Sequence, residues 1–244
     1  MGIGPGDLNQ LTPRARNALA EADVVVGYAT YVRLIAPLLE GKRVIGSGMT
    51  REQERCRLAL RLAREGRQVV LVSGGDPGIY GMAGPMLELI GREATPGGAG
   101  PSDFELEVIP GITAASAAAG ALGAPLANDF GVVSLSDLLV PWEVIARRLE
   151  ALAAADLVIA LYNPRSSRRF EQLNRACGIL LRHREPGTPV GVVRKAGQPA
   201  EEVQITTLGA LAETTVDMNT TVIVGNSSTR VVNGWLVTSR GYRW

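Results

Sequence analysis

The sequence predicts an α/β fold of two lobes, and three observations lead to this prediction. Short β-branched runs alternate with helical patterns along the chain, as in sheets of parallel strands joined by helices. Hydrophobic residues make up 46% of the chain but aromatic residues only 5%, so the core is built from Val, Leu, Ile and Ala, as in a sheet covered by helices on both faces. The length of 244 residues fits two lobes of ordinary domain size.

The first lobe, which we place at residues 1–125, has the more regular alternation and predicts a mostly parallel sheet. An Arg-rich helical segment stops at Gly66, and the buried strand after it runs into a glycine loop. The expected strands are 24–26, 44–45, 68–72 and 104–109, and the expected helices are 28–39, 51–65, 82–90 and one opened by 111–113.

The second lobe, at residues 126–244, follows a break at Gly123-Ala124-Pro125. Its last three strands are joined by fewer helices, so we expect a mixed sheet. The expected strands are 131–135, 157–161, 190–193, 202–206, 221–224 and 235–238, and the expected helices are 141–153 and the segment from the turn at Pro164 to about His183.

Charge and composition exclude several classes of partner. Lys and Arg total 25 against 24 Asp and Glu, so the net charge of +1 supports no nucleic-acid partner. Residues 111–127 are too short and too weakly apolar to span a bilayer, and the first residues lack the pattern of a signal peptide. Cys56 and Cys177 form no CxxC pair, so we expect a reducing, cytoplasmic environment.

The loop at residues 73–81 is the strongest candidate for a ligand site. Ligands of open α/β sheets bind beyond the carboxyl ends of the strands, where this loop lies. Gly74 and Gly75 allow close approach of the backbone, and the Asp76 carboxylate is able to accept hydrogen bonds from ligand hydroxyl or amine groups. The alternative is a tight turn in which Asp76 caps the next helix.

The other candidate loops are less distinctive, and several chemistries are excluded. The first loop, residues 2–7, fails as a dinucleotide fingerprint because Asp7 replaces its third glycine, Pro5 removes a backbone donor and no strand precedes it. His183 is the only histidine and lies in a charged stretch, so neither a histidine triad nor a metal site is expected. The arginines of residues 51–67 form a solvated helix face or meet a substrate rich in carboxylates.

Five loops taken in order resemble the tetrapyrrole methyltransferase superfamily over essentially the whole chain. They are Gly2-Ile3-Gly4-Pro5-Gly6-Asp7, Ser73-Gly74-Gly75-Asp76-Pro77, Ile109-Pro110-Gly111-Ile112-Thr113-Ala114, Tyr162-Asn163-Pro164 and Thr220-Thr221-Val222-Ile223-Val224-Gly225. Residues 27–31, 129–143, 216–221 and 235–242 are similar to the precorrin-3B C17-methyltransferases within that superfamily.

The resemblance implies methylation of precorrin-3B at C17 with ring contraction to precorrin-4, in cobalamin biosynthesis. It also implies S-adenosyl-L-methionine as cofactor, S-adenosyl-L-homocysteine as product, a tetrapyrrole substrate and a homodimer. It implies cofactor contacts, with adjacent residues, at Pro5, Gly74, Gly75, Asp76, Ile79, Tyr80, Thr113, Ala114, Tyr162, Asn163, Ala196, Thr220 and Thr221. It points to Tyr28 for substrate binding and to Asp129, Ser136 and Asp7 as candidates for the proton transfer that ring contraction needs.

Two rival functions stay open at this point. One is a sister methyltransferase that acts on another corrin carbon or on a cobalt-containing intermediate. The other is a non-catalytic nucleotide-binding module, which would bind the cofactor without methylating a macrocycle.

Overall fold

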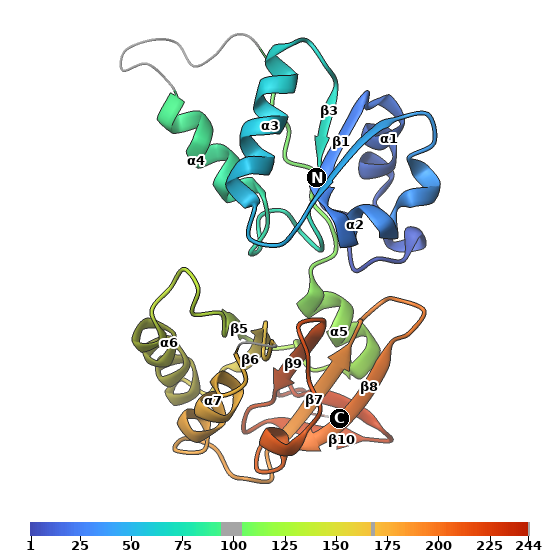
Figure 1. The fold of residues 1–244 in the computed structure, drawn as a ribbon. Helices are drawn as coiled ribbons and strands as arrows, with labels where there is room; N and C mark the ends of the chain where they lie inside the picture. Colours follow the sequence, from blue (N-terminus) through green and yellow to red (C-terminus); the bar gives the residue numbers. More distant parts are fainter. Residues whose placement is uncertain (94–103, 167–168, 244) are drawn as a thin grey trace. The chain divides into compact units, whose positions relative to one another are not determined.

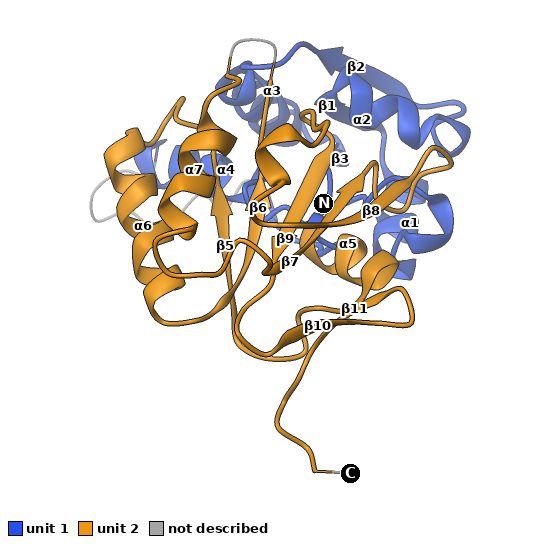
Figure 2. Cartoon of the chain, turned by 90° about the horizontal axis from the view of Figure 1, so that it is seen from below, with its two compact units in different colours: residues 1–114 blue, residues 115–244 orange. Residues whose placement is uncertain are grey.

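A computed structural model describes residues 1–93, 104–166 and 169–243. The chain forms two compact units, Met1–Ala114 and Ala115–Trp244 (Figure 2). This division falls at the first residue of helix α5 (Ala114–Leu122), and the sequence prediction puts the lobe boundary after residue 125. The helix belongs with the second unit because Ala115, Ala118 and Leu122 are buried in that unit's core.

The first unit contains a parallel sheet, as predicted. The order of its strands is β2-β1-β3, with β1 at Val24–Tyr28, β2 at Arg43–Ser47 and β3 at Val69–Leu71. Both pairings are parallel. The carboxyl ends of the three strands therefore meet at one edge of the sheet, where the glycine loop follows β3.

Helices cover both faces of this sheet (Figure 1). On one face, α1 (Pro13–Glu21) and α2 (Ala29–Leu34) pack against Val25 and Val70. On the other, α3 (Glu52–Arg64) and α4 (Ala83–Glu93) pack against Val24 and Val26. Successive valines of β1 thus serve opposite faces, which is why the strand reads as an unbroken apolar run.

Three expectations for the first unit differ from the structure. Helix α1 was not predicted, although Thr12 caps it through a 3.2 Å bond to the Ala15 amide and Pro13 occupies its first turn. The helix expected at 28–39 ends at Leu34 and is followed by a 3-10 turn, Ala36–Leu38, that contains Pro37. Residues 104–109 do not form the expected strand.

The second unit contains the expected mixed sheet, with strand order β5-β6-β9-β7-β8. Strands β5 and β6 are parallel, whereas β9 is antiparallel to both β6 and β7, and β8 is antiparallel to β7. The strands are β5 Phe130–Ser134, β6 Val158–Tyr162, β7 Pro189–Arg194, β8 Glu202–Thr207 and β9 Thr220–Val224.

Helices α6 (Trp142–Ala154) and α7 (Gln172–Leu180) pack on one face of this sheet, and α5 packs on the other. Helix α7 begins later than predicted, and Ser166 and Arg169, which precede it, exchange two backbone hydrogen bonds. A small second sheet has the order β10-β11-β4, with β10 at Thr229–Val232, β11 at Trp235–Thr238 and β4 at Gly123–Ala124. Of these strands, only β11 was predicted.

Gly191 on β7 sets how closely α5 approaches the mixed sheet. A Cβ at this position would stand 2.3 Å from Cδ1 and 2.7 Å from Cδ2 of Leu122, a fully buried side chain of α5. The close packing of α5 therefore requires a residue without a side chain at this position of β7.

We expect Gly191→Ala to lower the free energy of unfolding by about 1–3 kcal/mol, because the added methyl overpacks the contact with Leu122. Gly178→Ala is the matched control, since Gly178 lies within α7 and a Cβ there meets no neighbouring atom. That control should stabilise the protein by about 0.5–1 kcal/mol. Urea unfolding of both variants measures the difference, and an equal effect of the two would contradict the packing described.

Candidate functional site

Three glycine-containing loops interlock through their backbones at the carboxyl edge of the first unit's sheet. Gly4 and Gly75 exchange two hydrogen bonds of 3.1 and 2.9 Å, and the Gly2 amide donates to the Ile109 carbonyl at 2.9 Å. A Cβ on Gly2 or Gly111 would stand 2.5 or 2.3 Å from the Gly75 oxygen. The glycines are therefore needed for backbone to lie directly on backbone.

The Asp76 carboxylate joins two of these loops. Its Oδ1 accepts from the Gly78 amide at 2.8 Å, and its Oδ2 accepts from the Gly111 amide at 3.1 Å. Asp76 is not the N-cap of the next helix, because α4 begins only at Ala83. The carboxylate thus fixes the shape of the loop edge, and each of its oxygens keeps further acceptor capacity.

The remaining cofactor candidates of this unit surround the same loops. Ile79 and Tyr80 lie in the loop between β3 and α4 and are 39% and 58% exposed. Tyr80 also has a φ of 52°, a left-handed backbone that is uncommon outside glycine and often found at functional sites. Pro5 is half-buried beside Gly4, and Thr113 directly precedes Ala114, the first residue of α5.

Tyr28, the predicted substrate residue, lies at the same edge. It ends β1, and its ring meets that of Tyr31 in an edge-to-face contact with 5.2 Å between centroids. Tyr31 in turn fills the space above Gly74, where a Cβ would stand 2.6 Å from the phenol carbon Cζ. Sequence reasoning did not single out Tyr31 itself, although it belongs to the stretch 27–31 that carries part of the resemblance.

In the second unit, topology gathers the predicted residues at one edge of the mixed sheet. Ser136 follows the carboxyl end of β5, Tyr162 and Asn163 lie at the end of β6, and Ala196 follows β7. Strand β9 runs the opposite way, so its first residues face the same edge, and Thr220 pairs with Arg194. Thr221 pairs with Val193 in the same register.

Hydrogen bonds fix several of these side chains. The Asn163 amide donates to the Ser134 hydroxyl at 2.9 Å, and the Ser136 backbone amide donates to the same hydroxyl at 3.2 Å. The Tyr162 hydroxyl accepts from the Ala115 amide in the first turn of α5 at 2.7 Å. Ser134 was missed from sequence because a serine at the end of a strand carries no pattern of its own.

Thr220 and Thr221, the first two residues of β9, are buried at this edge of the sheet. The Thr220 hydroxyl donates to Asp217 Oδ1 at 3.0 Å, and Arg194 donates to Asp217 Oδ2 at 2.8 Å. Burial alone would raise the pKa of Asp217, but the bonds from Arg194, the Asn219 amide and Thr220 outweigh it and lower that pKa. The carboxylate therefore stays ionised and locks the turn before β9.

Two of the three candidates for proton transfer, Asp129 and Ser136, do not converge. Asp129 precedes β5 and Ser136 follows it, so the two lie at opposite ends of a five-residue strand, about 17 Å long. They therefore cannot act on one reacting atom together. Asp7, in the first unit, caps a 3-10 helix (Leu8–Gln10) by accepting from the Asn9 amide at 2.8 Å.

Among residues 1–93, 104–166 and 169–243, no group of three or more His, Cys, Asp or Glu side chains is arranged to hold a metal ion. Within those same ranges, no helix has the length and apolarity needed to cross a membrane.

Comparisons with known proteins give a consistent result. The family model for tetrapyrrole (corrin/porphyrin) methylases matches residues 1–212. The chain is 49% identical, over 99% of its length and 98% of the relative, to a probable cobalt-factor III C(17)-methyltransferase of Salmonella typhimurium. Two other curated relatives are longer proteins, of which the chain spans 44% and 52%.

Solved structures agree in fold. A crystal structure of the methyltransferase CobJ superposes with a TM-score of 0.89 at 41% identity, covering 98% of this chain and 97% of that one. A uroporphyrin-III C-methyltransferase from Thermus thermophilus, solved with S-adenosylhomocysteine, superposes with a TM-score of 0.69 at 28% identity. That alignment covers 92% of this chain and 95% of the other.

Proposed function

The chain belongs to the tetrapyrrole (corrin/porphyrin) methylases, and we propose that it transfers a methyl group from S-adenosyl-L-methionine to C17 of a corrinoid in cobalamin biosynthesis. The observation that carries this proposal is the interlocked glycine edge of the first unit, where the loops of Gly4, Gly75 and Gly111 meet and Asp76 accepts from Gly111. The chain that contains this edge is 49% identical to a probable C17-methyltransferase over almost its whole length. A cytoplasmic homodimer is part of the same proposal.

Cobalt-factor III is the substrate we favour, because it is the substrate in the name of the relative that matches the chain over 98% of its own length. Precorrin-3B, with ring contraction to precorrin-4, is the second candidate. It is supported by residues 129–143, which resemble the precorrin-3B enzymes. The name of the first candidate specifies cobalt, and the name of the second does not.

The residues of the glycine edge fit a sulfonium cofactor. The loop 73–81 contains no Lys or Arg, so it brings no side-chain cation toward a positively charged sulfur. Asp76 supplies negative charge, and the exposed Ile79 and Tyr80 supply apolar area for a nucleoside. Gly75, at a φ of +62°, holds a backbone turn that other residues rarely adopt.

Bound S-adenosyl-L-methionine supplies a methyl group that is already activated for attack by a substrate carbon. The chain's main task is therefore positioning, which contributes much of the acceleration when reacting atoms are held close and in line. The backbone contacts of Gly4, Gly75 and Gly111 keep the edge rigid, and Tyr28 and Tyr31 form an aromatic wall beside it.

Ring contraction needs a proton donor or acceptor near the macrocycle. Ser136 is the candidate of the second unit that lies at the carboxyl edge, near Ser134 and Asn163. Asp129 lies at the opposite end of β5, so we assign it no part in a shared centre with Ser136. Asp7 stays a separate candidate in the first unit, where substitution would also remove the cap of its 3-10 helix.

We expect Asp76→Asn to weaken S-adenosylhomocysteine binding at least about tenfold, which corresponds to roughly 1.4 kcal/mol. An amide removes the negative charge and can no longer accept from both Gly78 and Gly111. Asp156→Asn is the matched control, because Asp156 also accepts from a neighbouring backbone amide, that of Ser227, but lies at the amino end of β6. Calorimetric titration of both variants with S-adenosylhomocysteine measures the two affinities. An unchanged affinity in Asp76→Asn, or equal losses in both variants, would contradict the assignment of Asp76 to the cofactor site.

The substrate is tested by parallel incubation of the protein with cobalt-factor III and with precorrin-3B, each with methyl-labelled S-adenosyl-L-methionine. We expect labelled product, followed by mass and absorption spectra, at least about tenfold faster from cobalt-factor III. A faster reaction of precorrin-3B would favour the second candidate. Cofactor binding with no labelled macrocycle from either compound would favour a non-catalytic binding module.

A further inference from the structure

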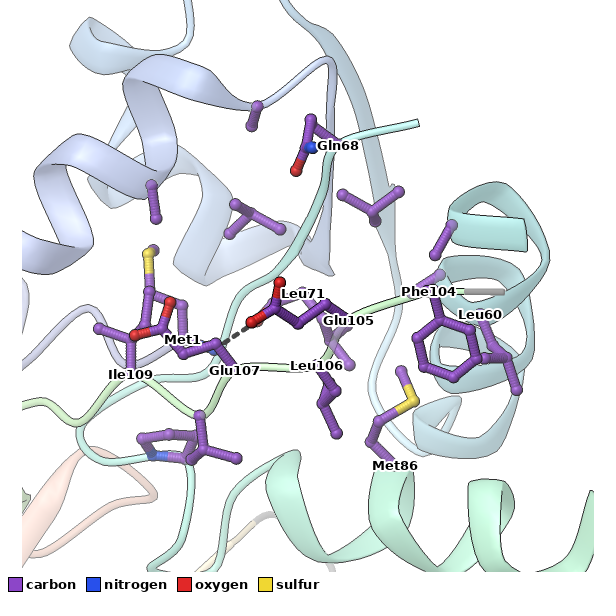
Figure 3. Close-up of a pocket in the computed structure, with 18 of the residues that line it drawn as sticks. Met1, Leu60, Gln68, Leu71, Met86, Phe104, Glu105, Leu106, Glu107 and Ile109 are labelled. Carbon is purple, nitrogen blue, oxygen red and sulfur yellow. Dashed lines mark hydrogen bonds between the residues drawn. The ribbon is translucent and has the colours of Figure 1, made fainter. Parts of the chain in front are cut away.

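The two units hold the carboxyl edges of their sheets together by different means. In the first unit, backbone groups of separate segments bond directly to one another. Besides the glycine contacts, the Met1 nitrogen donates to the Leu71 carbonyl at 2.9 Å, beside a cavity of about 530 Å³ (Figure 3). In the second unit a single side chain, that of Arg169, contacts the loops after β5 and β6 and the turn before β9.

The guanidinium group of Arg169, which lies between β6 and α7, bonds to three separate places. Its Nη1 donates to the Leu135 carbonyl at 3.2 Å and to the Asn163 carbonyl at 3.3 Å. Its Nη2 donates to the Met218 sulfur, a weak acceptor, at 3.3 Å. Leu135 follows β5, Asn163 follows β6 and Met218 precedes β9. One side chain thus ties together three segments at the same edge of the sheet.

The shape of the arginine side chain suits these contacts. A guanidinium group carries five N–H donors in a fixed fork, so its two terminal nitrogens reach acceptors on different loops, whereas a lysine has one nitrogen. Arg169 is half-buried, and within the described residues its side chain bonds to two carbonyl oxygens and a sulfur and forms no ion pair with a carboxylate. The side chain therefore acts on the position of the loops.

The loops joined by Arg169 carry the predicted residues of the second unit. The carbonyl of Asn163 accepts from Arg169, and the side-chain amide of Asn163 donates to the Ser134 hydroxyl at 2.9 Å. The same hydroxyl accepts from the Ser136 amide at 3.2 Å. Both polar ends of Asn163 are therefore fixed, and Ser136 shares one of the two bridges between the loops.

The turn before β9 is held from two sides. Arg194, at the end of β7, donates to Asp217 Oδ2 at 2.8 Å, and the Thr220 hydroxyl donates to Asp217 Oδ1 at 3.0 Å. Arg169 contacts the neighbouring residue, Met218, from the side of β6. Contacts therefore run from the end of β7 through this turn to the loops after β6 and β5, and Arg169 makes the last link.

We propose that Arg169 is a positioning residue, which holds Asn163 for the cofactor and Ser136 for the macrocycle. The inference rests on the proposed function, because the roles of Asn163 and Ser136 belong to it. Loss of the guanidinium group would release the loops but leave the strands paired, since β5, β6 and β9 pair through their backbones. Ordering the released loops would then add to the cost of binding the cofactor.

The test is calorimetric titration of the full chain and of Arg169→Ala with S-adenosylhomocysteine, below the Tm of both. We expect the affinity of Arg169→Ala to be at least about tenfold weaker. Free guanidinium ions, far below the concentrations that unfold proteins, should restore part of that affinity in the variant by supplying the missing donors. They should not raise the affinity of the unsubstituted chain.

Arg184→Ala is the matched control. Arg184 also donates to backbone carbonyls of the mixed sheet, those of Gly225 and Leu157, but these lie at the opposite edge, after β9 and before β6. We expect this variant to have a lower Tm but an unchanged affinity. Arg169→Lys and Arg184→Lys, which keep the charge, give the same comparison if an alanine variant does not fold.

An unchanged affinity in the Arg169 variants would overturn the inference. So would equal losses in the Arg169 and Arg184 variants, or a loss in Arg169→Ala that guanidinium ions do not reverse. If the unsubstituted chain binds no S-adenosylhomocysteine, the proposed function is contradicted instead. The amide chemical shifts of Ser136 and Met218, which need no ligand, then test Arg169 alone, and unchanged shifts in Arg169→Ala would overturn its role.

Discussion

The backbone contact among Gly2, Gly75 and Gly111 is the constraint on which the glycine edge of the first unit depends. A Cβ on Gly2 or Gly111 would come within 2.5 Å of the Gly75 carbonyl oxygen, so the three loops meet only if these positions stay glycine. The Asp76 carboxylate then ties the second loop to the third. A rigid edge of this kind holds a ligand without reorganising, which lowers the entropic cost of binding.

The second unit has a comparable edge, but different contacts hold it together. Its sheet is mixed, and the reversed direction of β9 brings Thr220 and Thr221 to the carboxyl ends of β6 and β7. Part-buried polar pairs, rather than glycines, fix this edge. Asp217 locks the turn before β9, and the bond from Asn163 to Ser134 links the loops after β6 and β5.

Most strands and the parallel or mixed character of the two sheets followed from the sequence, because buried β-branched runs such as Val24–Val26 have few alternatives. The strand predicted at residues 104–109 was wrong, because an alternation of apolar and acidic residues does not by itself supply a pairing partner. The loops were found by their glycines and their place after strands. The roles of Ser134, Tyr31 and Asp217 in holding the loops were not predicted. Their hydrogen bonds and ring contacts are made in the folded chain and leave no pattern in the local sequence.

We propose that the interlocked glycine edge of the first unit binds the cofactor. Titration of isotope-labelled protein with S-adenosylhomocysteine, followed by amide chemical shifts, tests this directly. The account predicts that the largest shifts in the first unit fall on Gly75, Gly78 and Gly111. Shifts concentrated at Val69, Leu71 and Leu106, with those three glycines unchanged, would contradict it.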